Sequence, residues 1–157
     1  MRSGVRRWTS RTAAVGLLMI MVVGCSRTAG LTPPTPEGAT ADLCRELITA
    51  TPEVVDDQDR VETDPQSPYT TAWGRPAITL ACGVQKPAGL NAASQCAEVN
   101  GVGWYAEDRD GDYRFTTIGR KAYVQVVVPD KYAPQANPLV DLAQPIKDTI
   151  PVIKNCV

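Results

Sequence analysis

Cysteine and the acidic residues are the side chains that offer chemistry here, because the chain of 157 residues has five cysteines and no histidine. Without an imidazole there is no Ser-His-Asp or Cys-His nucleophile pair and no histidine metal ligand. A glycosidase-type carboxylate pair stays open, with candidates at Glu98, Glu107, Asp108, Asp110 and Asp112. Three of these share one predicted turn, whereas such a pair must flank a cleft. The residues therefore favour a protein that is not an enzyme, with a small cell-wall hydrolase as the alternative.

Four of the cysteines are widely spaced along the chain, at Cys44, Cys82, Cys96 and Cys156. An even number of cysteines in an exported chain predicts two disulfides, and four cysteines allow three connectivities. Among these we favour Cys44 with Cys82 and Cys96 with Cys156. The chain has no C-x-x-C motif, so we expect no thioredoxin-like centre. We also expect no metal site and no cofactor.

The fifth cysteine, Cys25, closes a segment with the parts of an export signal. Four arginines and no acidic residue precede an apolar run at 13–23, which is 11 residues long. A membrane-spanning helix needs about 20 apolar residues, so the run predicts a cleaved signal peptide over 1–24. It ends in the letters VVGC, which resemble the bacterial lipobox. That resemblance implies cleavage before Cys25 and lipidation of its thiol by acyl chains such as palmitate. A plain signal peptide and a twin-arginine signal are the alternatives.

We therefore expect a secreted protein of the cell envelope, lipid-anchored to the cell membrane on its extracytoplasmic face. Its partners would be the membrane, through the lipid on Cys25, and an unknown envelope protein or cell-wall component. Cleavage removes four of the 16 basic residues and leaves 12 against 17 acidic ones, a net charge of −5. Nucleic acid requires a basic surface, so we expect no nucleic-acid partner.

The mature chain divides into a spacer and one domain. Residues 25–39 are rich in proline, threonine and glycine and show no hydrophobic period, which predicts a lipid-anchored flexible tether. Residues 40–157 have the size of a single domain. Within it, residues 56–69 are polar and contain two prolines, which predicts a surface loop.

Two helices and four strands are expected in this domain. Apolar residues at helical spacing predict helices over 41–50 and 137–150, the second kinked or broken at Pro145. Short apolar runs bounded by proline and glycine predict strands at 77–84, 102–107, 113–118 and 122–128. Asp110-Gly111 is a strong hairpin signal, and short connections favour an antiparallel meander of the last three strands. The expected fold is α+β, a small antiparallel sheet of about four strands with two helices packed on one face, braced by two disulfides.

Several stretches of the domain resemble a known family. The segment 71–84 (TAWGRPAITLACGV), the letters VGW at 102–104, FTTIGR at 115–120 and the terminal Cys156 are similar to the actinobacterial lipoproteins of domain-of-unknown-function family 3515. The resemblance covers most of the mature domain, and the W-G-x-P-A…C-G-V block is its most specific part. It implies an envelope protein of a high-GC Gram-positive organism, and it carries no activity because the family has none assigned.

The candidate binding residues are Trp73, Arg75 and Trp104. The two tryptophans offer flat apolar surface, and the arginine offers a charged handle for a sugar or a peptide. The alternative is that both tryptophans are core residues and that the residues around Arg75 form a plain turn. Arg75, Arg114 and Arg120 could also converge on an anionic ligand, although scattered surface arginines are the default. We expect a non-catalytic binding or scaffolding module.

Overall fold

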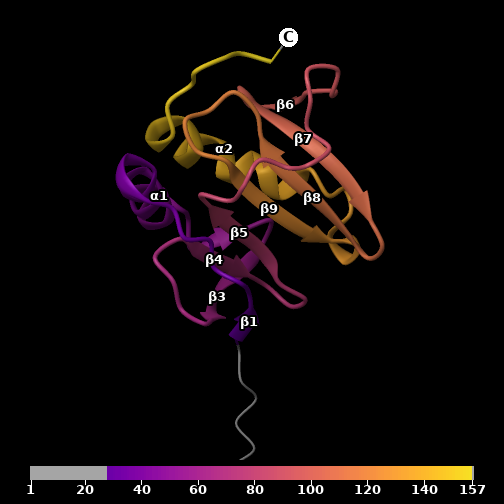
Figure 1. The fold of residues 1–157 in the computed structure, drawn as a ribbon. Coiled ribbons are helices and arrows are strands. Elements are labelled where there is room, and N and C mark those ends of the chain that lie inside the picture. Colours follow the sequence, from indigo (N-terminus) through magenta and orange to yellow (C-terminus); the bar gives the residue numbers. More distant parts are fainter. Residues whose placement is uncertain (1–27, 157) are drawn as a thin grey trace, which may run out of the picture.

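The protein is described by a computed structural model over residues 28–156, so the predicted signal peptide and the predicted lipidation site Cys25 lie outside the described residues. Its elements, in chain order, are β1 (Thr28–Gly30), α1 (Gly38–Ala50), β2 (Val54–Val55), β3 (Gln58–Asp64), β4 (Thr70–Trp73), β5 (Ile78–Cys82), β6 (Ala97–Val99), β7 (Val102–Arg109), β8 (Asp112–Thr117), β9 (Val124–Pro129), the short 3-10 helix η1 (Asp130–Tyr132) and α2 (Asn137–Thr149) (Figure 1).

One mixed sheet of nine strands forms the body of the molecule. Its strands follow the order β1-β3-β4-β5-β9-β8-β7-β6, and β2 pairs with β3 outside this path. The pair β1 and β3 is parallel, whereas the other pairs are antiparallel. The prediction of a small sheet of about four strands was therefore wrong. The four expected strands are β5, β7, β8 and β9, and the expected meander is the run β7-β8-β9. The α+β class is confirmed.

The strands that the sequence did not predict carry little hydrophobic pattern. β3 falls inside the expected loop over 56–69, and Thr63 is the one buried residue among its seven. Its backbone is satisfied by hydrogen bonding to β4 on one side and to β1 on the other. β4 is fully buried but has four residues, too few to show a period. Pairing with distant segments, and not local hydrophobicity, makes these residues strands.

The chain ahead of α1 lies against the sheet. Residues 28–30 were expected within a flexible tether, but they form β1, and the Leu31 amide donates to the Asp64 carbonyl (3.1 Å). Farther along, the ring of Pro36 is so close to Gly83 that a Cβ there would lie 2.6 Å from it. The described part of the expected tether is thus packed on the domain.

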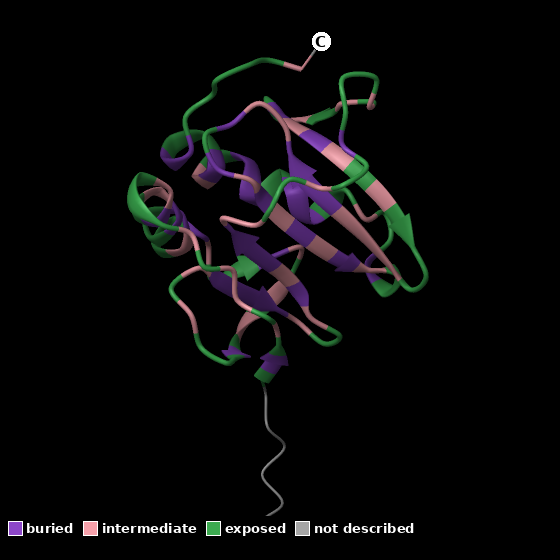
Figure 2. Ribbon diagram, in the orientation of Figure 1, coloured by how far each residue is buried: buried purple, intermediate pink, exposed green. Residues whose placement is uncertain are grey.

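Both helices cover the same face of the sheet, where the core lies. Alternate residues of β9 are buried, and the register places these next to the buried residues of β5 and β8. Each large apolar side chain buried in this way contributes about 1.5–3 kcal/mol. The aliphatic and phenylalanine side chains of this core include Leu47 of α1, Leu139, Leu142 and Ile146 of α2, and Ile78, Leu80, Phe115, Val124, Val126 and Val128 of the sheet. Figure 2 shows buried residues along the strands and helices that enclose it.

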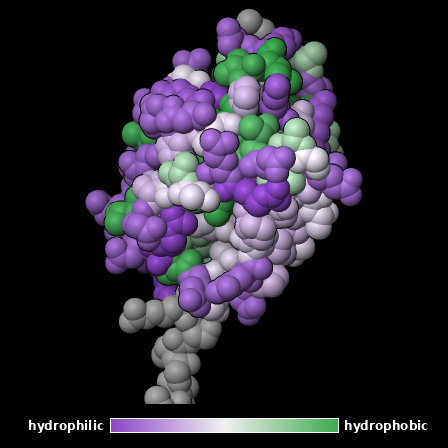
Figure 3. All heavy atoms as spheres, turned by 90° about the vertical axis from the view of Figure 1, so that its left-hand side faces the viewer, coloured by the Kyte–Doolittle hydropathy of each residue, from purple (hydrophilic) through white to green (hydrophobic). Residues whose placement is uncertain are grey.

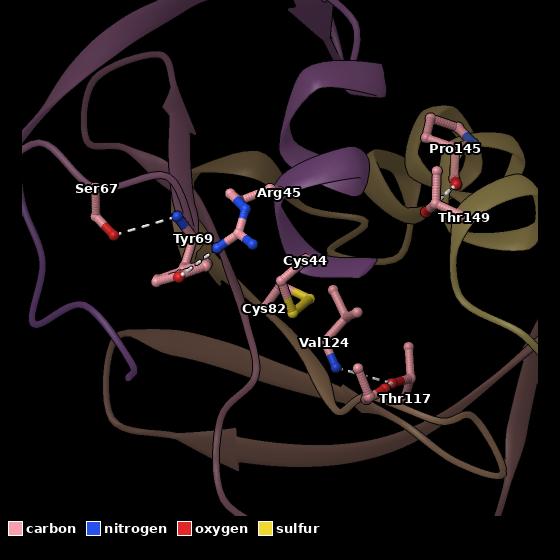
Figure 4. Close-up of a disulfide and its surroundings, with 10 residues drawn as sticks. Cys44, Arg45, Ser67, Tyr69, Cys82, Thr117, Val124, Pro145 and Thr149 are labelled. Carbon is pink, nitrogen blue, oxygen red and sulfur yellow. Dashed lines mark hydrogen bonds between the residues drawn. A yellow bond between two sulfur atoms is a disulfide. The ribbon is translucent and has the colours of Figure 1, made fainter. Parts of the chain in front are cut away.

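The two disulfides predicted from the cysteine count are present, in the pairing that we favoured. Cys44–Cys82 joins α1 to the end of β5, with a Cα–Cα distance of 5.3 Å (Figure 4). Cys96–Cys156 joins the residue before β6 to the C-terminal segment, with a Cα–Cα distance of 5.8 Å. The sequence separations are 38 and 60 residues. In the loop-entropy description each closure stabilises the fold by about 4 kcal/mol.

The second helix runs through Pro145 without a break. Pro138 lies in the first turn, where a missing amide costs nothing, and the helix continues to Thr149. Its C-terminal end is closed by the buried guanidinium of Arg120, which donates to the carbonyls of Ile150 (2.6 Å), Ile146 (3.4 Å) and, in the turn before β7, Gly101 (3.2 Å). Desolvation lowers the pKa of Arg120. Within residues 28–156 no helix has the length and apolar character needed to cross a membrane.

Candidate functional site

Trp73, the first candidate binding residue, belongs to the core. Its side chain is fully buried, and its indole N–H donates to the Pro52 carbonyl (3.0 Å). The guanidinium of Arg60 lies 5.5 Å from the ring centroid, a cation–π contact. The indole ring is therefore enclosed by the protein and offers no face to a ligand. The alternative of a core tryptophan is the one that the structure supports.

Trp104, the second candidate, is also fully buried and meets Phe115 edge to face, with ring centroids 6.5 Å apart. It lies in β7, whereas Trp73 lies in β4, and three strands of the sheet separate the two. At about 4.8 Å per strand, β4 and β7 are some 19 Å apart along the sheet. The structure does not bring the two tryptophans together in a site.

Arg75 is exposed and lies at the tip of the turn between β4 and β5. Gly74 has φ +73°, and a Cβ at that position would lie 2.7 Å from the Tyr132 hydroxyl oxygen and 2.9 Å from the Gln58 side chain. The same Tyr132 hydroxyl donates to the Pro76 carbonyl (2.8 Å), and the Lys131 ammonium donates to the Arg75 carbonyl (2.6 Å). These two contacts from η1 brace the turn, so the backbone of Arg75 is held in place while its side chain is exposed.

Two hollows meet at this turn. The larger, about 870 Å³, lies between the turn and residues 57–62 of the β2–β3 hairpin. The smaller, about 310 Å³, lies between the turn and β1, and residues 28–30, Val61 and Thr79 complete its wall. Val61, Gly74 and Arg75 line both hollows. Among these three shared residues, Arg75 is the charged one.

The two hollows differ in charge. The larger is lined by the carboxylates of Asp57, Asp59 and Glu62 and by two guanidinium groups, those of Arg60 and Arg75. Among the described residues that line the smaller hollow, Arg75 is the charged one. The three carboxylates come from one strand and the turn before it, so they do not face one another from separate elements as a hydrolase pair must.

Arg60 has a structural role that the sequence did not reveal. Its guanidinium donates to the Thr71 hydroxyl (2.6 Å) and to the carbonyl of Thr51 (2.7 Å), and it pairs with Glu53 (3.1 Å). These contacts tie β3 to the segment after α1. The alternation of charged and uncharged residues over 60–64 was the signal for a strand here, and it was too polar to be read as one.

The three arginines considered for an anionic ligand do not converge. Arg120 is buried at the end of α2, and Arg114 lies in β8, two strands away from β5. Arg114 lies opposite Glu107 of β7, so the two side chains are on the same face of the sheet. Of these three arginines, Arg75 alone lines the hollows described above.

Exposed apolar surface is sparse in the described part of the chain. The large hydrophobic residues exposed there are Val54, Val140, Val152 and Ile153, all aliphatic. The side that carries α1 is mostly hydrophilic, with hydrophobic residues in separate groups (Figure 3). Between residues 28 and 156 no group of three or more acidic or cysteine side chains is arranged to hold a metal ion. The turn at Arg75 therefore remains the best-defined candidate site.

The comparison with known families agrees with the resemblance noted in the sequence. A family described as "Protein of unknown function (DUF3515)" matches residues 12–154. The chain belongs to this family. No curated protein and no solved structure matches it.

In this DUF3515 chain, the residues of the W-G-R-P-A…C-G-V block have separate structural roles. Trp73 fills the core, Gly74 makes room for Tyr132, and Cys82 is bonded to α1. Gly83 has φ +87° and lies against Pro36. Arg75 is the charged residue of the block, and its side chain is exposed. The block therefore builds a braced turn whose one charged side chain, that of Arg75, is exposed.

Proposed function

We propose that the protein is a lipoprotein of the actinobacterial cell envelope, with a signal peptide over residues 1–24 and lipid on Cys25. Its domain is a non-catalytic module that binds another envelope component at the surface around Arg75. The observation that supports this role is the exposed arginine on a braced turn, where two hollows of about 870 and 310 Å³ meet. A charged side chain on a braced turn next to concave surface suits the recognition of a polar ligand.

The hydrolase alternative has less support. The acidic residues of the larger hollow share one strand and its turn, and Asp108, Asp110 and Asp112 lie on or beside the β7–β8 turn. Of these, Asp108 accepts a hydrogen bond from the Tyr113 hydroxyl (2.9 Å) and Asp112 pairs with Arg109 (3.7 Å). These contacts lie within one hairpin and do not span a cleft.

The anchor is tested by Cys25→Ala, with Ser26→Ala as the control for a change at the cleavage site. Cys25→Ala removes the thiol that would carry lipid, so we expect the variant to leave the detergent phase and the membrane fraction. Ser26→Ala should partition like the natural protein. If Cys25→Ala is cleaved near residue 25 and still partitions with the membrane, the lipoprotein proposal is wrong.

The binding surface is tested by Arg75→Ala, with Arg109→Ala as a matched change of an exposed arginine. Removing an exposed arginine alters stability by no more than about 0.5 kcal/mol, so both variants should melt like the natural protein. Quantitative affinity capture from the native envelope should recover less partner with Arg75→Ala and the normal amount with Arg109→Ala. A melting temperature lowered by several degrees with capture intact would assign Arg75 to the fold and refute the proposed site.

A further inference from the structure

The two disulfides differ in how far the protein encloses them. Cys44 and Cys82 are fully buried, and the bond between them belongs to the hydrophobic core. Cys96 and Cys156 are each half-buried and lie outside that core. Thiol–disulfide exchange requires that a thiolate reach one of the two sulfur atoms, so access decides which bond reacts. Of the two bonds, Cys96–Cys156 is the one that a thiol outside the protein can reach.

Two small hollows reach this bond. One, about 90 Å³, is lined by both Cys96 and Cys156, and among the described residues of its wall Lys154 is the charged one. The other, about 60 Å³, is lined by Cys156, by Arg120 and Lys154, and by the acidic residue Glu98. Each is large enough to admit more than one water molecule, and hence a thiolate sulfur. The excess of positive charge around the hollows favours the approach of an anionic thiolate.

The C-terminal strap, residues 151–156, depends on this bond. Backbone hydrogen bonds also attach it to the segment after β8, and these run from the Ile153 amide to the Gly119 carbonyl (2.7 Å), from the Lys154 amide to the same carbonyl (3.0 Å), and from the Lys121 amide to the Pro151 carbonyl (3.0 Å). The strap before Cys156 is exposed, and among the described residues after Ile150 none belongs to the core (Figure 2). Exposed hydrogen bonds near a chain end open readily. Breaking the disulfide therefore frees the strap and leaves the core packed.

We infer that the Cys96–Cys156 disulfide is a thiol-exchange site, which an external dithiol reduces while Cys44–Cys82 stays intact. One thiolate of the dithiol attacks the sulfur of Cys156, which lines both hollows, and the S–S bond breaks. The electron pair of that bond passes to the Cys96 sulfur, which takes a proton from water. The second thiol of the reductant then displaces Cys156 from the mixed disulfide and passes its proton to it through solvent, so the reductant leaves as a disulfide and the protein has gained two electrons. This site depends neither on the lipid anchor nor on binding at Arg75.

Selective reduction is measured on the folded, oxidised full chain with graded dithiothreitol, followed by alkylation and peptide mass spectrometry. We expect Cys96 and Cys156 to be alkylated at least about tenfold faster than Cys44 and Cys82, because a fully buried sulfur reacts only when the structure opens. The fluorescence of the two core tryptophans should not shift while the first bond is reduced. Equal rates for the two bonds, faster reduction of Cys44–Cys82, or no reduction of Cys96–Cys156 in the folded chain overturns the inference.

Release of the strap is measured by hydrogen exchange of backbone amides in the selectively reduced protein. The amides of Ile153 and Lys154 should exchange about tenfold faster than in the oxidised protein, because the strap is no longer held in place. The Cys82 amide is the internal reference, since it donates to the Tyr69 carbonyl (2.9 Å) beside the other disulfide. Its exchange should not change.

The double variant with Cys96→Ser and Cys156→Ser lacks the bond and is the matched control for the reductant itself. It should show the same fast exchange at Ile153 and Lys154 with no dithiothreitol present. Unchanged exchange at these two amides, in the reduced protein or in the double variant, refutes release of the strap. A loss of protection at Cys82 as well would show that reduction opens the core, and it also overturns the inference.

Discussion

Arg120→Met should be among the most damaging single changes in the domain. The Arg120 side chain is 6% exposed and joins three backbone carbonyls that belong to the end of α2 and to the turn before β7. Methionine keeps the length and the apolar stem but removes every donor. The carbonyls of Ile150 and Gly101 then lose the partners that satisfy them inside the protein.

The expected loss follows from these contacts. A hydrogen bond to a charged group contributes about 1.5–3 kcal/mol, and the bonds to Ile150 (2.6 Å) and Gly101 (3.2 Å) have good length, whereas that to Ile146 (3.4 Å) is weak. The positive charge of Arg120 also interacts favourably with the negative C-terminal end of the α2 dipole, and the substitution removes this interaction. Burying a methionine instead recovers part of the loss. We expect a net loss of about 3 kcal/mol, which lowers the melting temperature of a domain of this size by about 10 °C.

Denaturation in guanidinium chloride, monitored by circular dichroism with the disulfides intact, measures this loss in the free energy of unfolding. Arg109→Met is the matched control, because Arg109 is exposed and its pairing with Asp112 is long, at 3.7 Å. That control should change the free energy of unfolding by no more than about 0.5 kcal/mol. A loss below about 1 kcal/mol for Arg120→Met, or one equal to that of the control, would show that Arg120 does not close the helix end.

Two further changes test the β2–β3 turn and the second disulfide. Burial, followed by the charges of Asp57 and Asp141, raises the pKa of Asp56, so the contribution of Asp56 to stability should fall as pH rises above the ordinary aspartate pKa near 3.9. Asp56→Asn should remove that fall and be the more stable protein at pH 7. The free energy of unfolding of both proteins, measured at several pH values, tests this, and two curves that stay parallel across the pH range would contradict it. At Gly103, a Cβ would lie 2.5 Å from the Cys156 sulfur and 2.8 Å from the Cys96 sulfur. Gly103→Ala should therefore cost about 1–3 kcal/mol in the oxidised protein and much less when Cys96 and Cys156 are both alanine, a difference that thermal melts of the four variants measure.

The part of the fold that could be predicted is the part whose pattern is local. β9 alternates buried and half-buried residues along its whole length, and Asp110-Gly111 forms the β7–β8 turn, with φ +89° at the glycine. Both features depend on neighbouring residues alone, so the sequence shows them directly. The helices α1 and α2 were predicted for the same reason, from apolar residues repeated at helical spacing.

The β2–β3 hairpin shows why other strands were missed. Its turn residues Asp56 and Asp57 both have positive φ, 48° and 58°, as a two-residue hairpin turn requires. Glycine or asparagine usually marks such a turn, and two aspartates do not. The strand that follows is polar because most of its side chains face solvent, while its amides and carbonyls are paired to β1 and β4.

Of the three candidate binding residues, Arg75 alone is exposed, in the turn before β5. Its role in binding stays a prediction. Trp73 and Trp104 were taken as ligand surfaces because aromatic residues near glycine and arginine suit a sugar site. Whether an aromatic ring is exposed depends on which face of the sheet it points to, and the register of the strands puts both rings on the helix-covered face.

The sequence by itself determined what depends on residue type and count. With no histidine it excluded imidazole chemistry, and with four spaced cysteines over residues 40–157 it predicted two disulfides. Tertiary structure decided which of the three cysteine pairings forms, that residues 28–30 join the sheet, and that Arg75 stands between two hollows. Each of these depends on segments far apart in the chain that come together when the core between the helices and the sheet is buried. No local pattern encodes such a contact, because the groups that complete it lie tens of residues away.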